Sequence, residues 1–265
     1  MRHVAFLISV IGLTASAVAP WAATDPRLDD ERQIGQQVFD ALKAKGEIVA
    51  SSPLYDRLTP IATAITKTVQ PQYGLPFKFY LVHEPQPNAF ATAGGNVFVT
   101  DSLMYFAKNT EQLAGTICHE VSHTLHHDSM TLIDKERRIE RRQLGAAIIL
   151  GPTKAHMLAI LLLGRLHQLG YSREAESAAD VTGSDVCAAS HYNPWGLVWL
   201  FRDFDAAEGT PVPQLLSDHP NNTNRVKTLE QHFRQNPKVF ASFSSDPKTA
   251  KPLSVPKDSK EVFMR

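Results

Sequence analysis

The sequence predicts an α+β fold that is predominantly helical and contains one small β-sheet. Helical periodicity dominates on both sides of a short central region, and only two segments there alternate as half-buried strands do. The chain has 265 residues, of which 43% are hydrophobic and 20% charged, a composition typical of soluble globular domains. A chain of this length can bury a sizeable core within one large domain or two small ones.

The first element is an amphipathic helix predicted at residues 28–45. Ile34, Val38 and Leu42 recur at helical spacing, and Gly46 is a typical residue just after a helix end. Acidic residues open the segment, where they interact favourably with the positive end of the helix dipole.

A second helix and two strands follow in the chain. Residues 53–69 have helical periodicity, whereas 77–82 and 96–100 alternate and are rich in β-branched and aromatic residues, which predicts strands. Between the strands, the paired glycines at the end of 88–95 indicate a turn or a close backbone approach.

The remainder of the chain is almost entirely helical in pattern. Helices are predicted at 111–128, 130–142, 155–168, 172–189 and 222–235. Residues 144–169 are the most apolar internal region, but their uncharged runs are too short to span a membrane. We expect a buried helical hairpin there, with peripheral membrane contact as the alternative.

The two ends of the chain differ from the middle. Arg2 and His3 precede a run of about 16 apolar residues that ends in small residues, which predicts a secretory signal peptide at 1–23 and export to the periplasm. Residues 237–265 are rich in Lys, Pro and Ser without periodicity, so we expect an extended or disordered tail after a folded domain at 24–236.

Charge and cysteine content exclude several classes. The chain has 27 Lys and Arg against 27 Asp and Glu, so no global field favours nucleic acid, and we expect no nucleic-acid partner. Two cysteines cannot form a disulfide scaffold or a four-sulfur metal site. The count of 11 histidines is high and directs attention to metal binding.

The chemical motif of the chain is HExxH, formed by His119, Glu120 and His123 within the predicted helix 111–128. Residues four apart share a helix face, so both imidazoles can reach one zinc ion. Glu120 is placed to reach a water bound by that ion without ligating it. The alternative is a helix with two surface histidines.

A catalytic zinc ion needs a third protein ligand. The metzincin pattern fails because His126 and Ser129 stand where it requires Gly and His. A distant carboxylate remains, and Glu176 is the best candidate, in a predicted helix with Ser172 as N-cap. Asp180 lies one turn further on the same face, where it can hold a ligand histidine by its second ring nitrogen.

These motifs together resemble the zinc peptidases of the CAAX-prenyl-protease/HtpX class. The resemblance rests on HExxH, then the segment 172–180, then His219-Pro220 with Arg225, and it covers about residues 28–235. With a signal peptide and no spanning segment, the chain is most similar to the soluble periplasmic members. No repeat of 30–40 residues follows, so we expect no tetratricopeptide repeat domain.

The resemblance implies a gluzincin-type metallopeptidase domain with its sheet beside the HExxH helix, and a role for each motif residue. One Zn²⁺ per chain would be bound by His119, His123 and Glu176. The catalytic residues would be Glu120 as general base, Asp180 as orienting residue or proton donor, and His219 as oxyanion stabiliser or occupant of the open zinc position. The substrate strand would pair with Asn88, Ala89, Phe90 and Ala91, while Arg225 and His127 would support the site.

The resemblance also brings the helices of Cys118 and Cys187 together at the metal, and an oxidising compartment permits a disulfide. Cys187, however, lies eleven residues beyond Glu176, which is about 16 Å along a helix. The pairing therefore stays open.

The leading hypothesis is a periplasmic zinc endopeptidase whose substrates are unfolded or misassembled envelope proteins. A second hypothesis is a protease-fold chaperone or adaptor that binds extended chains and is latent or weakly proteolytic; the intact Glu120 argues against it. A third, an intramembrane prenyl-protein peptidase, is disfavoured by the short apolar runs. An oligomer is compatible with each.

Overall fold

The computed structural model describes residues 25–144, 171–206, 219 and 222–255, and the structural statements below refer to these residues. The N-terminal elements are α1 (Pro26–Ala44), β1 (Ile48–Val49), α2 (Tyr55–Val69), η1 (Gln70–Gln72), β2 (Lys78–Val82), β3 (Ala89–Thr92), η2 (Ala93–Gly95) and β4 (Asn96–Thr100). The helical elements that follow are α3 (Asp101–Phe106), α4 (Thr110–Leu125), α5 (Asp128–Leu144), α7 (Arg173–Ala189), α8 (Trp195–Ala206), α10 (Asn222–Gln235), α11 (Pro237–Phe240) and η3 (Pro247–Thr249).

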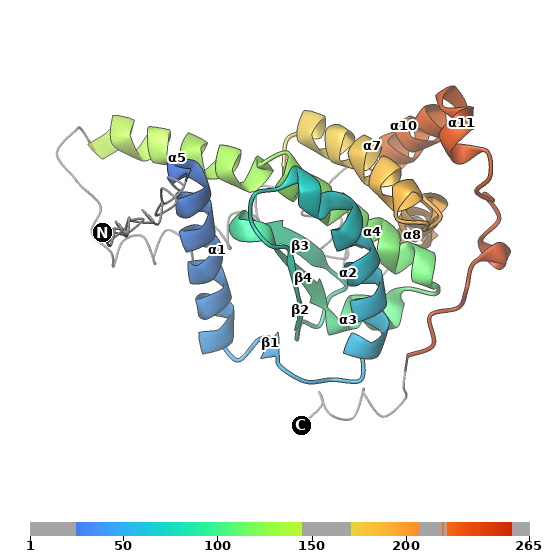
Figure 1. Ribbon diagram of the computed structural model, residues 1–265, viewed down its shortest axis with the longest axis horizontal. Coiled ribbons are helices and arrows are strands. Elements are labelled where there is room, and N and C mark those ends of the chain that lie inside the picture. Colours follow the sequence, from blue (N-terminus) through green and yellow to red (C-terminus); the bar gives the residue numbers. More distant parts are fainter. Residues whose placement is uncertain (1–24, 145–170, 207–218, 220–221, 256–265) are drawn as a thin grey trace, which may run out of the picture.

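The sheet has four strands in the order β1-β2-β4-β3 (Figure 1). The central strands β2 and β4 are parallel, with Tyr80 opposite Phe98, while β3 runs antiparallel to β4 with Phe90 opposite Phe98. Strand β3 is therefore an outer strand of the sheet. Its C-terminal end leads into the glycine turn, where Gly94 and Gly95 both have positive φ.

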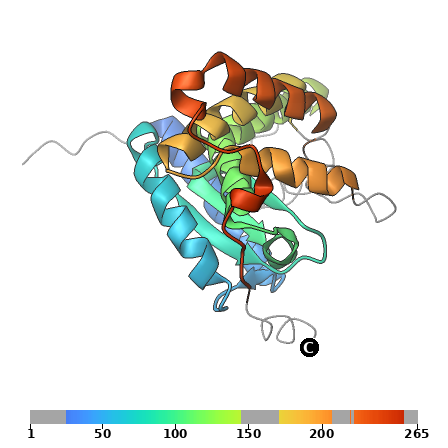
Figure 2. The same ribbon diagram turned by 90° about the vertical axis from the view of Figure 1, so that its right-hand side faces the viewer.

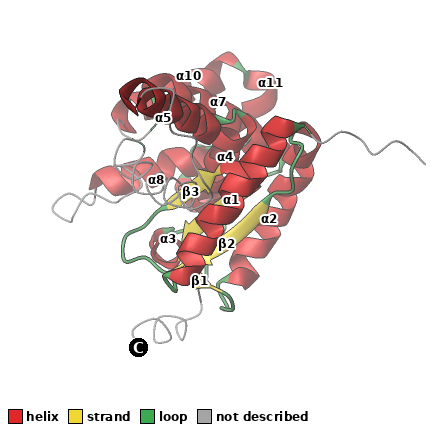
Figure 3. Ribbon diagram, turned by 90° about the vertical axis from the view of Figure 1, so that its left-hand side faces the viewer, coloured by secondary structure: helices red, strands yellow, loops and turns green. Residues whose placement is uncertain are grey.

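Helices cover both faces of this sheet (Figures 1 and 3). Apolar side chains of α1, among them Val38 and Leu42, pack against Phe98 on one face. Side chains of α2 and α4, including Ile65 and Ile117, share a larger core with the opposite face. Helix α4 is thereby buried beside β3, which fixes the helix that carries HExxH next to the outer strand.

Helices α7, α8, α10 and α11 lie on the side of α4 that faces away from α1, whereas α5 packs on α1, with Met130 and Ile133 against Ile34 (Figure 1). Helices α7 and α8 pack directly against α4, and α10 covers both of them (Figure 2). A second core of α8, α10 and α11 contains Phe201, Leu229 and Phe240. No helix among the described residues is long and apolar enough to cross a membrane.

The segment after α10 differs from the predicted tail. Residues 237–255 begin with the short helix α11 and continue as a strap across the fold, drawn in red in Figure 2. Lys251 accepts a backbone hydrogen bond from Thr110, and the Leu253 N–H donates to the Lys108 carbonyl. Leu253 also packs on the main core. The polar composition of this segment did not predict that it packs on the fold, because backbone groups make most of its contacts.

The predicted fold class, a predominantly helical α+β domain with a small sheet beside the HExxH helix, is confirmed. Within 88–95, residues Ala89–Thr92 form β3, and the paired glycines that predicted a turn or close backbone approach lie in η2 with positive φ. The predicted signal peptide (1–23), the helix 155–168 and, apart from its first residue, the hairpin 144–169 lie outside the described residues.

Candidate metal centre

Helix α4 presents three buried polar side chains on one stretch of its surface. The helix is capped by Asn109, whose side chain accepts a hydrogen bond from the Gln112 N–H. His119, Glu120 and His123 are each at most 2% exposed. The Nε2 atoms of the two histidines lie 3.0 Å apart and face one another. Two imidazole nitrogens held this way, far from water, form the beginning of a metal-binding site.

Helix α7 supplies the third donor. It begins after Ser172, whose hydroxyl accepts a hydrogen bond from the Ala175 N–H, as predicted for the N-cap. The two carboxylate oxygens of Glu176 lie 3.5 Å from the Nε2 atoms of His119 and His123. Donor atoms around a tetrahedral zinc ion are about 3.3 Å apart, so these separations suit one ion.

His219 completes the cluster. Its Nδ1 lies 2.7 Å from Glu176 Oε1, and its Nε2 lies 3.4 Å from Glu120 Oε1. One donor atom from each of His119, His123, Glu176 and His219 lies within 4.8 Å of all the others, and all four residues are buried. The structure thus brings the three predicted ligands and His219 together.

Two carboxylate oxygens of the cluster lack a hydrogen bond, although Arg225 lies 3.2 Å from Glu176 Oε2 and His219 lies 3.4 Å from Glu120 Oε1. Glu120 Oε1 and Glu176 Oε2 are buried and make no hydrogen bond within the described part of the chain. An unpaired buried carboxylate oxygen costs free energy comparable to a lost hydrogen bond or more. The donor set therefore fits a bound metal ion, with Glu176 as ligand and Glu120 beside it.

Asp180 orients a ligand. Its Oδ1 lies 3.1 Å from His119 Nδ1, the ring nitrogen that faces away from the cluster. Arg225 donates hydrogen bonds to the same carboxylate from Nε and one terminal nitrogen. Its other terminal nitrogen donates to the His219 carbonyl at 3.1 Å. Its guanidinium also lies over the Phe201 ring. Arg225 therefore fixes both the orienting carboxylate and the segment that carries His219.

His119 and His123 have pKa values shifted in opposite directions. Burial and the charge of Arg225 lower the pKa of His119, but hydrogen bonds with Asp180 and Glu176 outweigh them and raise it to about 9. Burial lowers the pKa of His123 to about 3, although the hydrogen bond that its Nδ1 forms with the Asp128 carboxylate opposes this shift. Without metal, His119 therefore holds a proton at neutral pH, while His123 is neutral and ready to ligate.

The pKa values of the three carboxyl groups are also shifted in different directions. Burial raises the pKa of Glu120, which moves this carboxyl toward the range useful for a general base at neutral pH. Burial also opposes ionisation of Glu176 and Asp180, but neighbouring cations prevail. The charges of His219 and His119 hold the pKa of Glu176 well below its usual range, and Arg225 lowers that of Asp180 to about 2.

The predicted substrate residues form the outer strand beside Glu120. The Asn88 carbonyl accepts from the Thr100 N–H, so its backbone faces β4, and by alternation that of Phe90 does too. The backbones of Ala89 and Ala91 face the other way. The Ala91 N–H donates to Glu120 Oε2 at 2.9 Å, which ties the strand to the HExxH helix.

The placement of His127 corrects a prediction. Helix α4 ends at Leu125, and His127 has a φ of 55°, so the helix face of His119 and His123 does not continue to it. Its Nδ1 instead lies 2.9 Å from Glu31 of α1. His127 therefore holds α1 to the corner between α4 and α5, and none of its described contacts is with a metal ligand.

Two residues of the centre were missed in the sequence. Asp128 Oδ2 lies 2.8 Å from His123 Nδ1 and plays for this ligand the part that Asp180 plays for His119. The ring of Tyr171 stacks on His123. Neither has a periodic relation to HExxH, since one follows the helix break and the other belongs to a distant segment. A carboxylate just past an HExxH helix was the one available signal.

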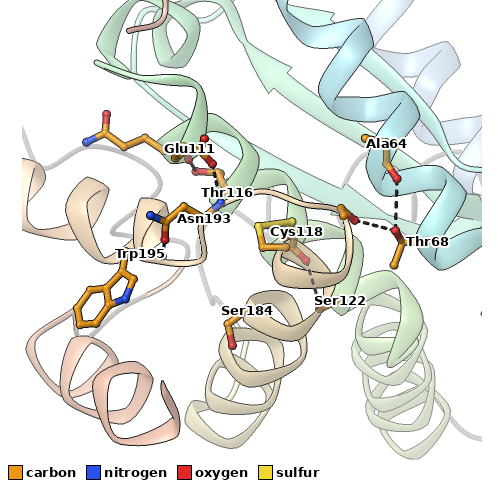
Figure 4. Close-up of a disulfide and its surroundings, with 12 residues drawn as sticks. Ala64, Thr68, Glu111, Thr116, Cys118, Ser122, Ser184, Asn193 and Trp195 are labelled. Atoms are coloured by element: carbon orange, nitrogen blue, oxygen red, sulfur yellow. Dashed lines mark hydrogen bonds between the residues drawn. A yellow bond between two sulfur atoms is a disulfide. The ribbon is translucent and has the colours of Figure 1, made fainter. Parts of the chain in front are cut away.

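The two cysteines form a disulfide bond between α4 and α7, with Cα atoms 5.7 Å apart (Figure 4). The helices cross where Gly183 meets the backbone of His119, since a Cβ atom there would lie 3.0 Å from His119 Cα. Cys187 is one turn beyond this crossing. Counting from Glu176 overestimated the separation because the backbones of the two helices meet at Gly183, which is only four residues before Cys187.

An HExxH helix beside an outer strand, with a distant glutamate as third donor, defines a metallopeptidase-type centre of the gluzincin arrangement. The chain belongs to peptidase family M48, whose model matches residues 56–232. This confirms the resemblance to the CAAX-prenyl-protease/HtpX class. Peptidases of this family depend on a metal ion, and the buried donor set here could bind one.

Two curated relatives are similar over most of the chain. The mitochondrial metalloendopeptidase OMA1 of Schizosaccharomyces pombe is 27% identical over 213 residues, which is 78% of this chain and 62% of that protein. The beta-barrel assembly-enhancing protease of Escherichia coli is 26% identical over 256 residues, which is 89% of this chain and 52% of that protein. The chain thus spans between half and two thirds of these relatives.

Proposed function

We propose that this chain is a zinc-dependent endopeptidase that cleaves unfolded or misassembled proteins of the cell envelope. The observation that carries the proposal is the buried cluster of three histidines and Glu176, beside which Glu120 Oε1 makes no hydrogen bond and lies 3.4 Å from His219 Nε2. Histidine and carboxylate donors in this number suit zinc. Membership of the peptidase family and the names of both relatives support the reaction class.

The residues divide the work of peptide hydrolysis. Zinc, when held by His119, His123 and Glu176, supplies Lewis acidity that polarises a peptide carbonyl and acidifies water. Glu120, with its raised pKa, accepts the proton of the attacking water and returns it to the leaving amine. Asp180 keeps the His119 ring in a ligating orientation through its Nδ1.

The substrate class follows from the outer strand. An extended chain can add to β3 through backbone hydrogen bonds, a mode that gives affinity with little sequence preference. Folded proteins do not offer a free extended segment, whereas unfolded or misassembled ones do. The name of the Escherichia coli relative, which refers to β-barrel assembly, supports envelope proteins as the source of such chains.

Export to the periplasm is part of the proposal. The predicted signal peptide supports it, and so does the Cys118–Cys187 bond, because disulfides form and persist in oxidising compartments. Peripheral membrane contact through residues 144–169 belongs to the same proposal. Flotation of the protein with anionic vesicles tests that contact.

The deciding experiment measures zinc content and cleavage of unfolded casein for the wild type and for Glu120→Gln. We expect about one zinc ion per chain in both, with cleavage lowered at least about 100-fold in the variant and abolished by a chelator. Glu111→Gln, on the same helix but against Asn193, is the matched control and should cleave normally.

Other outcomes separate the alternatives. Zinc without cleavage in the wild type would contradict the peptidase and favour a chaperone or adaptor that binds extended chains. That role is tested by suppression of casein aggregation. Absence of zinc from both proteins would contradict the site itself.

A further inference from the structure

Tyr171 lies against the metal cluster without belonging to the donor set. It directly precedes Ser172, the N-cap of the helix that carries Glu176. Its ring stacks on the imidazole of His123, with centroids 4.0 Å apart and planes inclined by 19°. Because it is stacked in this way, the partly buried Tyr171 ring limits rotation of the His123 imidazole about its bond to the rest of the side chain.

The hydroxyl of Tyr171 continues the contact toward the sheet. It lies 2.9 Å from the Oγ of Ser129, a buried residue in the first turn of α5. The same Oγ donates to the carbonyl of Ala91 in β3 at 3.4 Å. Because serine has one hydroxyl hydrogen, this arrangement makes Tyr171 the donor to Ser129 and Ser129 the donor to Ala91.

Ala91 is the residue of β3 at which two parts of the centre meet. Its carbonyl accepts from Ser129, and its N–H donates to Glu120 Oε2. Both backbone groups therefore face the site and not β4. A continuous set of contacts runs from the His123 ring through Tyr171 and Ser129 to the outer strand.

We propose that Tyr171 is a positioning residue with two separable parts: its ring holds His123 for zinc, and its hydroxyl, through Ser129, holds β3 for the substrate chain. Asp128 fixes Nδ1 of the same imidazole, so two neighbours leave Nε2 directed at the cluster. The second part rests on the proposed peptidase function, whereas the first concerns zinc binding alone.

Zinc affinity tests the ring without any substrate. In competition with a chromogenic chelator, Tyr171→Leu should bind zinc at least about tenfold more weakly than wild type, as expected when a neighbour that orients a ligand is lost. Tyr171→Phe keeps the ring and should stay within about threefold of wild type. Tyr192→Phe, beyond the end of α7, is the matched control and should behave as wild type in every assay.

Peptide kinetics test the hydroxyl. Tyr171→Phe and Ser129→Ala should each raise KM for an unstructured peptide about threefold or more. The double variant should have a KM no higher than either single variant, because both substitutions break the same chain of hydrogen bonds to β3. Zinc affinity unchanged in Tyr171→Leu would overturn the role of the ring. Independent, additive effects of the two hydroxyl variants would overturn the tie to β3.

If the chain shows no peptidase activity, the zinc measurements still decide the first part. Each variant is also compared with wild type by thermal unfolding of the metal-free protein. A lowered midpoint accompanied by wild-type zinc affinity would show that Tyr171 serves only as packing at the start of α7 and would overturn the proposal.

Discussion

Each histidine of HExxH contacts a carboxylate through its Nδ1, yet the two histidines differ in protonation. Asp180 reaches Nδ1 of His119 and Asp128 reaches Nδ1 of His123. At His119, hydrogen bonds with Asp180 and Glu176 outweigh burial and raise the pKa to about 9, whereas at His123 burial prevails over the hydrogen bond with Asp128 and the charge of Glu176. One ligand therefore has to lose a proton before it can bind metal, and the other does not.

This difference predicts how zinc binding depends on pH. Below pH 9 the metal-free His119 is protonated, so binding one zinc ion releases one proton, and the apparent affinity should rise up to about tenfold per pH unit from 7 to 9. In Asp180→Asn the hydrogen bond that raises the pKa is weakened, and the dependence should move to lower pH. Chelator competition at several pH values measures both.

Asp185→Asn is the control for that series, because Asp185 is on the same helix but pairs with His232 at the surface. Its pH profile should match the wild type. A wild-type affinity that is flat between pH 7 and 9 would contradict the protonated state of His119.

His219 makes a separate prediction at this scale. Its Nδ1 contacts Glu176 Oε1, the oxygen that also faces His123, so it lies where a fourth ligand would complete the cluster. If His219 holds the centre in a resting state, His219→Ala should cleave casein at least about twofold faster than wild type and bind zinc more weakly. His232→Ala, on the outer side of α10, should change neither.

A loss of activity in His219→Ala would instead assign this residue to oxyanion stabilisation. Removal of one such donor typically lowers the rate about 100-fold or more. The two roles therefore predict changes of opposite sign in one assay.

At the scale of elements, the centre depends on the crossing of α4 and α7. Gly183 allows the backbones to touch at His119, and the Cys118–Cys187 bond closes a loop of 69 residues beside this contact. In the chain-entropy account, a crosslink over such a loop restricts the unfolded chain and stabilises the fold by about 2–4 kcal/mol. The bond and the glycine together keep the donors of the two helices in register.

Reduction of the disulfide should therefore lower the free energy of unfolding by about 2–4 kcal/mol. Urea denaturation of oxidised and reduced wild type measures this while keeping the volume of the buried sulfur atoms. The variant with Cys118→Ala and Cys187→Ala should be at least as unstable as the reduced protein and insensitive to reductant. Equal stability of the oxidised and reduced wild type would contradict the prediction.

Elements with strong periodicity could be predicted from the sequence, and short ones could not. The apolar spacing of Ile34, Val38 and Leu42 predicted the buried face of α1, because one side of that helix is buried. Strand β1 has two residues, and α8 is apolar on nearly all sides, so neither has a period to detect. Such elements are defined by what packs on them.

The same distinction applies within the centre. His119, Glu120 and His123 are related by helix geometry, and spacing alone brought them together. Tyr171 and Asp128 reach His123 only because α5 and the start of α7 fold back on α4. These contacts depend on tertiary packing, and no local pattern in the sequence predicts them.

At the scale of the whole molecule, the chain after α11 joins elements that are distant in sequence. The Trp199 indole N–H and the Asn193 amide donate to carbonyls at the start of the strap, and Arg57 of α2 donates to the Ser254 carbonyl near its end. Between them, Lys251 bonds the first residue of α4. The strap therefore holds the beginning of the HExxH helix from outside.

A chain that ends at residue 243 should consequently be less stable than one that ends at 255. It loses the hydrogen bonds of the strap and the burial of Leu253 on the main core, which together should lower the free energy of unfolding by at least about 3 kcal/mol. Urea denaturation of the two chains measures the difference. Because both keep α10 and the donors of the cluster, their zinc affinities under native conditions should agree within about threefold.

Hydrogen exchange locates the effect. The Thr110 N–H, which bonds Lys251 in the strap, should exchange faster in the shorter chain, whereas amides near His119, in the middle of α4, should follow the global stability of each chain. Equal exchange at Thr110 in the two chains would show that α4 begins in the same way without the strap. The metal centre would then rest on the contacts of α4 with β3 and α7 alone.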